Sequence, residues 1–229
     1  MVNLNEEKIR TDCTVDEPLE DYSSILESLP GVEVIFRNHE RRLIELLEQY
    51  PAVVGNVAWL TSLPVLDAMA KMKWVSIVVQ KEDLWRPDGL GNQSWKTELR
   101  AHYSAVPSNL IRDHFGVPVR FMSSFRDPRV YPIRCVGITG ERYAPRAHNK
   151  FLVFCDVEGE YNQKLTPLAV WTGSYNLTAT AKRSFENAVL LTNEEAASVY
   201  FREYSQILAL SEPLDWEHEY VAPEWRIGT

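Results

Sequence analysis

Residues 146–156 read RAHNKFLVFCD, the pattern of a buried β-strand that opens on two polar side chains. Side chains two residues apart in a strand face the same side, so we expect His148 and Lys150 to project together. Phe151 and Val153 then face a core on the other side. Two further apolar runs follow closely in the chain, and these three segments together decide the fold.

The second run, residues 165–171, leads into the turn sequence GSYN at 173–176. Glycine permits a tight turn, and Ser174 or Asn176 is suited to cap a following helix. The third run is a predicted strand that opens on Glu186. Histidine, lysine, asparagine, serine and glutamate thus lie at the ends or on one face of adjacent elements. That set suits phosphoryl chemistry, which needs a nucleophile or acid, a cation, neutral donors and an orienting carboxylate.

In this order, H-x-K, G-S-x-N and E-N-A-V resemble the signature of the phospholipase D superfamily. The similarity is greatest to its short bacterial nuclease-like branch, which carries one motif per chain. It is strong over residues 146–192 and weaker from about residue 33 onward. The sequence departs from the family at Cys155, where an aspartate that is mostly a structural partner usually stands. That departure bears on local packing more than on the chemistry.

The resemblance implies a metal-independent phosphodiesterase that works through a phosphohistidine, with no cofactor and no metal ligands. His148 would be the nucleophile or the general acid, and Glu186 would orient its ring. Lys150 and Asn176 would bind phosphate, while Ser174 would bind phosphate or frame the turn.

Such chemistry uses two imidazoles, and the chain has one H-x-K block. The other four histidines lack both a lysine two positions on and a following G-S-x-N: His39, His102, His114 and His218. We therefore expect a homodimer with a composite site across a two-fold axis, as the family's single-motif members imply. A metal site is not expected, because no H-x-x-x-H and no C-x-x-C occurs in the sequence.

The net charge of −8 argues at first against nucleic acid, but the charge is unevenly distributed. Residues 117–183 carry +5, whereas residues 1–30 carry −6 and residues 184–229 carry −7. A basic cluster is either a solvated face or a phosphate-binding surface, and its coincidence with the H-x-K block favours the second. The candidate substrate-binding residues are Arg126, Arg129, Arg142, Arg146, Lys182 and Arg183.

Strand and helix patterns alternate from residue 32 to residue 79, and the strands are continuously apolar. Such alternation is typical of parallel strands that are covered by helices on both faces. With the resemblance, it predicts a phospholipase D-like α/β/α sandwich with a mixed, largely parallel central sheet. The predicted strands cover 32–36, 52–60, 74–79, 117–122, 133–138 and 186–192, and the predicted helices include 39–49, 178–183 and 194–208. Helix caps are expected at Asn38, at Thr61 or Ser62, and at Asn193. A further helix or helix pair that packs on the sheet is indicated by Trp95, Leu99, Tyr103 and Val106.

Three regions are expected: an acidic, flexible or loosely docked arm over 1–30, a catalytic domain over 31–210, and an aromatic and acidic tail over 211–229. The tail is expected to pack on the domain or on a dimer partner. No apolar segment follows Met1 and no run approaches the ~20 residues of a membrane span. Three scattered cysteines indicate a reducing compartment, so we expect a cytoplasmic protein.

The leading functional hypothesis is a nuclease that cleaves DNA or RNA. The basic loops and the lack of an amphipathic membrane-facing helix favour nucleic acid over phospholipid. A hydrolase of phospholipid or of a small phosphodiester is the first alternative. The second is a catalytically idle module that binds nucleic acid or protein, which Cys155 and the acidic termini leave open.

Overall fold

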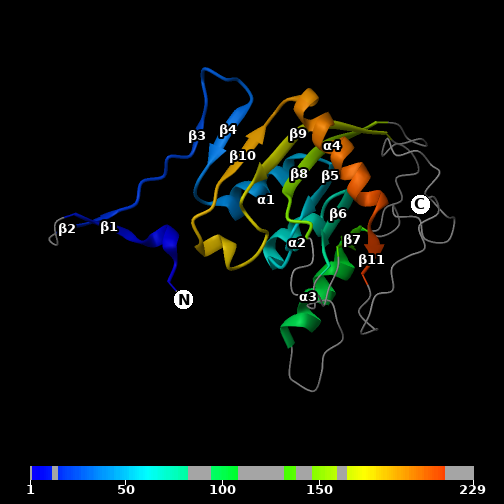
Figure 1. Ribbon diagram of the computed structural model, residues 1–229, viewed down its shortest axis with the longest axis horizontal. Helices are drawn as coiled ribbons and strands as arrows, with labels where there is room; N and C mark the ends of the chain where they lie inside the picture. The colour runs from blue at the N-terminus through cyan, green and yellow to red at the C-terminus, as the bar shows by residue number, and fades with distance from the viewer. Residues whose placement is uncertain are drawn as a thin grey trace.

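A mixed β-sheet forms the centre of the computed structural model, which describes residues 2–11, 15–81, 94–107, 132–137, 146–158 and 164–214 (Figure 1). The expected α/β class with a mixed central sheet is confirmed. Within the described residues, the strands of this sheet are β3 (Ser24–Ile25), β4 (Val32–Ile35), β5 (Ala52–Val57), β6 (Trp74–Gln80), β7 (Ile133–Val136), β8 (Lys150–Glu158), β9 (Lys164–Gly173), β10 (Ala188–Leu191) and β11 (Glu212–Pro213). Their order across the sheet is β11-β7-β6-β5-β8-β9-β10-β4-β3.

Parallel pairing is confined to β5–β6 and β6–β7 among the described strands, and the other six pairs are antiparallel. The expectation of a largely parallel sheet is therefore wrong. It treated residues 32–79 as one parallel unit, but β4 pairs with β10, where Val34 lies opposite Val189. The link between β8 and β9 covers only residues 159–163, too short for a parallel crossover, so these strands form a hairpin.

Helices cover both faces of the sheet (Figure 1). On one face lie α1 (His39–Gln49), α2 (Leu63–Ala70) and α3 (Ser94–Ala105), whose apolar side chains share a core cluster with Leu152. On the other face α4 (Glu194–Ala209) packs over Phe151 and Val153. Both faces of β8 are therefore buried over residues 151–155, as the uninterrupted apolar run at these positions indicates.

Two of the four predicted helix caps are confirmed. The Ser62 hydroxyl accepts a hydrogen bond from the Val65 amide at the start of α2, and Asn193 Oδ1 accepts one from Ala196 at the start of α4. Asn38 precedes α1 in the left-handed conformation, with a φ of 56°, and its side chain makes no capping bond. The prediction of a helix over 39–49 is correct, and its expected cap is not.

The predicted helix over 178–183 is reduced to a 3₁₀ turn, η4 (Ala181–Arg183). Neither Ser174 nor Asn176 caps this turn, contrary to expectation. Thr178 Oγ1 accepts the Ala181 amide instead, at 3.1 Å. The two polar side chains of the turn sequence are therefore not engaged in capping, which leaves them for other contacts.

Trp95 was expected on the inner face of the helix that proved to be α3, but it is 51% exposed. Leu99 and Tyr103 of the same helix are buried as expected, and the Tyr103 hydroxyl donates to the Leu60 carbonyl at 2.7 Å. The predicted strand 117–122 and most of the C-terminal tail, residues 215–229, lie outside the described residues.

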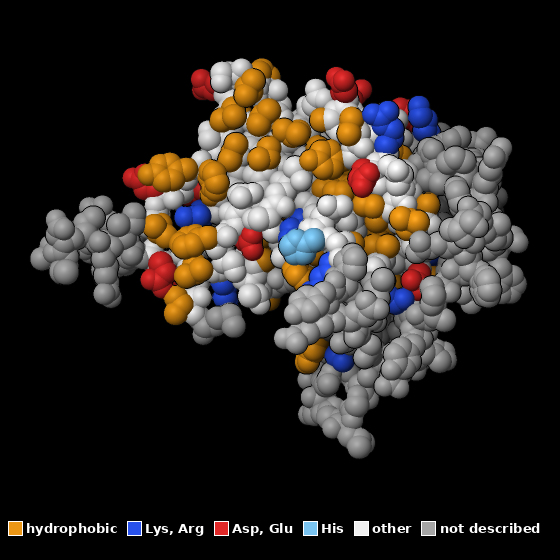
Figure 2. Space-filling view, in the orientation of Figure 1, with side chains coloured by type: hydrophobic (Ala, Val, Ile, Leu, Met, Phe, Trp, Pro, Cys, Tyr) orange, Lys and Arg blue, Asp and Glu red, His pale blue; other side chains and the backbone are white. Residues whose placement is uncertain are grey.

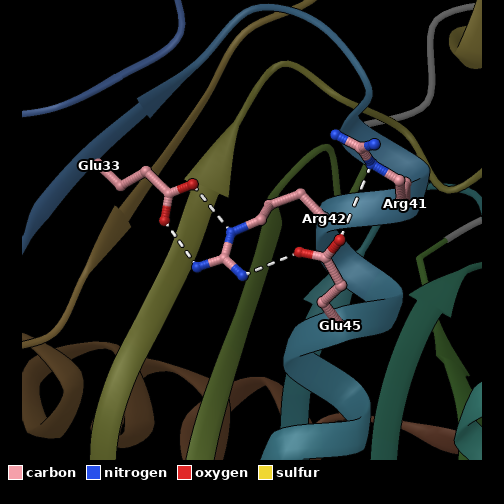
Figure 3. A network of polar contacts seen from close by, with 4 residues as sticks. All are labelled: Glu33, Arg41, Arg42 and Glu45. Atoms are coloured by element: carbon pink, nitrogen blue, oxygen red, sulfur yellow. Dashed lines mark hydrogen bonds and ion pairs between the residues drawn. The ribbon is translucent and has the colours of Figure 1, made fainter.

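Arg42 ties α1 to the sheet (Figure 3). Its Nε and Nη2 donate to the two carboxylate oxygens of Glu33 on β4, each at 2.8 Å. Its Nη1 also reaches Glu45 one turn further along α1, at 3.1 Å, and the exposed Arg41 approaches the same carboxylate at 3.8 Å. The paired, partly buried carboxylate of Glu33 raises the pKa of Arg42, which therefore stays charged in this contact.

Two buried polar contacts hold β11 against the rest of the sheet. Lys81 Nζ lies 3.1 and 3.0 Å from the two carboxylate oxygens of Glu212, and both side chains are buried. Arg134 on β7 donates to the hydroxyl and the carbonyl of Ser211, at 2.7 and 2.6 Å. Arg134 belongs to the basic segment of the sequence but lies in the interior, so it does not contribute to a basic surface.

The N-terminal residues lie beside the domain and partly outside it. A two-stranded hairpin of β1 (Lys8–Thr11) and β2 (Val15–Pro18) projects away from the main sheet (Figure 1). Before it, Asn5 in η1 (Leu4–Glu6) donates its side-chain amide to the carbonyls of Lys182 and Ser184, at 2.9 and 3.2 Å. The arm thus contacts the segment that leads to Glu186.

Candidate active site

Four strands bring the candidate residues to one edge of the sheet. β5 and β9 end there, and β8 and β10 begin there, because β8 is antiparallel to β5 and β10 is antiparallel to β9. Val57 lies opposite Lys150, and Gly173 lies opposite Ala188. We call this border the site edge and define it by these four residues. Segments that precede β8 and β10 or follow β9 therefore meet although they are far apart in the sequence.

His148 and Lys150 are in direct contact at the site edge. Lys150 Nζ lies 3.1 Å from Nδ1 and 3.3 Å from Nε2 of the His148 ring, and it donates to the His148 carbonyl at 2.8 Å. His148 is exposed, whereas Lys150 is buried. An ammonium group donates only to a ring nitrogen that carries a lone pair, and a lone pair is what a nucleophilic imidazole needs.

Trp59 packs beside both residues and was not singled out from the sequence. Its ring lies edge-on to the His148 ring with centroids 5.4 Å apart, and Lys150 Nζ lies 5.7 Å from its centroid. The indole therefore gives the ammonium group an aromatic face in place of water. Its sequence position was informative, since Trp59 lies two residues after the end of β5, but the strand that would lie beside β5 was not predictable.

Two hydrogen bonds fix the backbone before β8. The Gln80 side chain accepts the Ala147 amide at 2.6 Å, and the Asn149 carbonyl accepts the Ala58 amide at 2.9 Å. They hold the chain on both sides of His148. The ring thus sits on an anchored segment although its side chain is exposed.

The charge of Lys150 is tuned by two opposing effects. Burial lowers the pKa of its ammonium group, and the negative charge of Glu186 works in the opposite direction. Glu186 therefore acts on the site through its charge. It supports the protonated form of a lysine whose surroundings disfavour that form.

Ser174 and Glu186 form the second half of the site. The Ser174 hydroxyl donates a very short hydrogen bond to Glu186 Oε2 and accepts the Asn187 amide at 3.0 Å. The Ser174 amide in turn donates to the Asn187 carbonyl at 3.0 Å. Within the described residues, the hydrogen bond of the Glu186 carboxylate goes to Ser174 and not to His148, so the expected orienting contact is absent here.

Gly173 allows this close approach. A Cβ atom at this position would lie 2.2 Å from the Asn187 carbonyl oxygen and 2.7 Å from the Ala188 Cα. Only glycine lets the end of β9 and the start of β10 lie this close together. The glycine of the G-S-x-N motif thus sets the distance between the strands that carry Ser174 and Glu186.

Asn176 lies at the start of a segment that is anchored to the loop after β5. Leu177 donates to the Trp59 carbonyl at 3.1 Å, and its own carbonyl accepts the amides of Thr61 and Ser62 at 2.8 and 2.9 Å. Asn176 Oδ1 is buried and has no hydrogen-bond partner among the described atoms. Buried polar atoms are normally satisfied, so this oxygen can accept a hydrogen bond from a donor outside the described residues.

Buried side chains pack against the segment between Ser174 and Glu186 on its interior side. Tyr175 stacks on His39 with ring centroids 4.8 Å apart, and burial lowers the pKa of that imidazole. Glu40 accepts from Ser62 at 2.8 Å and from Lys182 at 2.6 Å. These supporting residues belong to no sequence motif, so their contacts were not predicted from the sequence.

Three of the six candidate substrate-binding cations belong to the described residues, and Figure 2 shows Lys and Arg side chains at several separate places on the face that it draws. Lys182 is held in the ion pair with Glu40, while Arg183 and Arg146 are exposed. The other three lie outside the described residues: Arg126, Arg129 and Arg142.

Cys155, the departure from the family pattern, is fully buried five residues into β8 and its thiol faces the α4 side of the core. Burial raises the pKa of this thiol well above its ordinary value, so the group stays neutral. Its neighbours in that core cluster include Ala52, Val54 and Phe201, which suit a small apolar side chain. The substitution therefore alters packing on the α4 face, away from the site edge.

No group of three or more histidine, cysteine or acidic side chains suited to a metal ion occurs in the part of the chain that the structure describes. Nor is any of the described helices long and apolar enough to cross a bilayer. Chemically, the site edge combines an exposed imidazole, a buried ammonium group, an unpartnered amide oxygen and a serine–carboxylate pair.

No protein-family model matches the chain. An uncharacterized protein of Acanthamoeba polyphaga mimivirus is 27% identical over 199 residues, which cover 82% of this chain and 68% of that protein. NucT from Helicobacter pylori is similar with a TM-score of 0.47 and 13% identity, over 79% of this chain and 96% of that one. Nuc from Salmonella typhimurium, described as a phospholipase D family member, is similar with a TM-score of 0.46 and 13% identity, over 79% and 95% of the two chains. Because these similarities are low, the function is inferred from the site itself.

Proposed function

We propose that this chain is a phosphodiesterase of the phospholipase D superfamily that cleaves nucleic acid through a phosphohistidine. The observation that supports it most is the contact of Lys150 with the His148 ring, beside the Ser174–Glu186 pair. A histidine with a lone pair next to a buried cation suits attack on a phosphodiester, whose negative charge the cation attracts and stabilises.

In the proposed reaction a neutral His148 nitrogen forms a bond to phosphorus while the bond from phosphorus to the leaving oxygen breaks. A second, protonated imidazole donates its proton to that oxygen and becomes neutral. Water then attacks the phosphohistidine, gives a proton to the second imidazole, and releases His148. Lys150 and the Asn176 side chain bind the phosphoryl oxygens, for which the Lys150 ammonium group leaves its ring contact.

The second imidazole is proposed to come from a second copy of the chain. Of the other histidines in the described residues, His39 is buried beneath Tyr175 and His102 is bound to Asp67 on α2 at 2.7 Å. Neither is engaged at the site edge. A homodimer with both His148 side chains in one composite site would supply the missing proton donor.

Nucleic acid is the proposed substrate class because the segment that contains the motif carries a charge of +5 on an acidic chain. Exposed Arg146 and Arg183 are the described residues suited to phosphates next to the scissile one. Their contribution predicts binding that weakens as the salt concentration rises.

The test measures cleavage of single- and double-stranded DNA and RNA, and of bis(p-nitrophenyl) phosphate, in the presence of a chelator. His148→Ala should abolish cleavage of every substrate, and the matched variant His102→Ala should retain it. Cleavage that needs a metal ion or survives His148→Ala would refute the proposed chemistry. Cleavage of the small diester alone would indicate a non-nucleic-acid substrate, and nucleic-acid binding without any turnover would indicate an idle module.

A subunit-mixing experiment tests the composite site separately. If each site needs two His148 side chains, equal amounts of wild-type and His148→Ala subunits, allowed to exchange, should retain about a quarter of the wild-type activity. Independent sites in each subunit would retain about half.

A further inference from the structure

We infer that Phe185, backed by Arg37, is a stacking platform for an unpaired nucleobase, so that the substrate of the site is single-stranded nucleic acid. The inference rests on the proposed function and adds the part of the substrate that is recognised. Phe185 directly precedes Glu186 and is 53% exposed. The Arg37 guanidinium carbon lies 5.3 Å from the centroid of its ring. An exposed aromatic ring beside a cation is the combination that binds unpaired bases next to their phosphates.

The platform lies on the same border of the sheet as the reactive residues. Ala188 of β10 pairs with Ile35 of β4, so the chain just before β10 runs beside the chain just after β4. Along this border, in the direction from β8 to β4, Phe185 and Arg37 therefore follow the Ser174–Glu186 pair. β8 and β4 are three strands apart in the sheet, which is about 14 Å at the usual strand spacing. A strand of a few nucleotides with one phosphate at Lys150 can therefore reach Phe185 with a base.

Contacts on both sides hold the segment that presents Phe185. Before it, the Asn5 side chain binds the carbonyls of Lys182 and Ser184. After it, Asn187 exchanges hydrogen bonds with Ser174, at 3.0 Å in each direction. An aromatic side chain on an anchored backbone loses little conformational freedom when it binds a ligand, so it suits recognition.

Beyond Arg37 the surface is hollowed into a cavity of about 650 Å³ at the N-terminal end of α1. Arg37, Arg41 and Lys182 line it together with Asn3 and Asn5 of the N-terminal arm. Its walls also carry acidic side chains, of which Glu40 is paired with Lys182. The cavity thus gives a nucleic-acid strand room to continue past Phe185, with four acidic and three cationic side chains in its walls.

Base stacking requires an unpaired base, because a base in a duplex is already stacked on its neighbours. A phosphate-only surface would treat single and double strands alike. Phe185 therefore assigns the site to single-stranded substrates, and it does so through the bases without reading their sequence.

The test compares the binding of two oligonucleotides of equal length, oligothymidylate and an abasic chain with the same phosphates. All proteins are full-length and carry His148→Ala, so that no cleavage occurs. With Phe185 present, the base-bearing strand should bind about 5- to 150-fold more tightly than the abasic strand, the usual contribution of one stacked base. Phe185→Ala and Phe185→Leu should remove this difference, and Phe185→Trp should keep it.

Trp95→Ala is the matched control, because Trp95 is as exposed as Phe185 and has Lys96 Nζ 5.9 Å from its ring centroid, but it lies on α3. It should leave the difference between the two oligonucleotides intact. A Phe185→Ala protein that still prefers the base-bearing strand would overturn the inference. A shift of oligomeric state in sedimentation on Phe185→Ala would also overturn it, by assigning the ring to an interface between copies. Hydrolysis of bis(p-nitrophenyl) phosphate, which has no nucleobase, by proteins with His148 intact tests the proposed chemistry separately.

Discussion

Replacing Gly173 by alanine should greatly reduce the proposed activity while leaving the chain folded. The added Cβ would lie 2.2 Å from the Asn187 carbonyl oxygen, whereas real Cβ atoms essentially never come within 3.0 Å of another heavy atom. The start of β10 must therefore move away from β9 by about 0.8 Å. That shift stretches the two hydrogen bonds between Ser174 and Asn187, and it carries Glu186 with it.

A displacement of ~1 Å in a catalytic group costs about 100-fold in rate, and we expect a loss of that size in kcat/KM for Gly173→Ala. Forcing one methyl group between packed strands costs about 1–3 kcal/mol of unfolding free energy. Both quantities are measurable on one preparation, the rate with bis(p-nitrophenyl) phosphate and the stability by urea unfolding followed by circular dichroism.

Leu190→Ala is the control for stability alone. Leu190 is a buried residue of the same strand, and its truncation should cost about 2–5 kcal/mol by leaving a cavity without pushing the strands apart. Its folded fraction should keep wild-type kcat/KM. The reasoning is refuted if Gly173→Ala retains wild-type kcat/KM, or if Leu190→Ala loses as much activity as the glycine variant does.

Three further predictions concern charge and burial. Glu186→Gln removes the negative charge that raises the pKa of Lys150. The pKa of Lys150 should fall, so the alkaline limb of the pH–rate profile should move to lower pH. An unchanged alkaline limb would show that the Glu186 charge does not act on Lys150. Glu212→Gln removes the carboxylate that lies 3.0 Å from the buried Lys81 ammonium group and should cost about 3–5 kcal/mol of unfolding free energy in urea, whereas a loss under ~1 kcal/mol would show that this contact contributes little. Cys155→Asp buries a carboxyl group among apolar side chains, which raises the pKa of this group above its value in the unfolded chain. The variant should lose about 2–7 kcal/mol of unfolding free energy at pH 8, and less as the pH falls through the raised pKa. Equal losses at pH 8 and pH 5 would contradict this prediction.

The sequence predicted local elements well because their signals are local. The helix over 39–49, the strand that leads to Gly173 and the Asn193 cap each depend on periodicity and on one or two end residues. It also indicated that His148 and Lys150 act together, since two-residue spacing needs only an extended backbone.

Strand partners were not predictable from the same patterns. An apolar strand looks the same in sequence whether it pairs with the next strand along the chain or with a strand about 150 residues away, as β4 does with β10. For the same reason Trp59 went unnoticed, because its place beside His148 depends on the antiparallel pairing of β5 with β8. The buried contacts of Tyr175 with His39 are likewise tertiary, and no spacing rule encodes them.

The hairpin of β8 and β9 and its continuation into β10 place His148, Lys150, Ser174 and Glu186 within one short part of the chain. Loops between neighbouring antiparallel strands close with a small loss of chain entropy, whereas the pairing of β4 with β10 must close a loop of about 150 residues. The reactive groups can thus assemble on a locally folded unit before the outer strands join it. The border of the sheet that carries Phe185 and Arg37 is completed only by β4, so the proposed stacking platform should form later in folding than the cluster proposed to carry the chemistry.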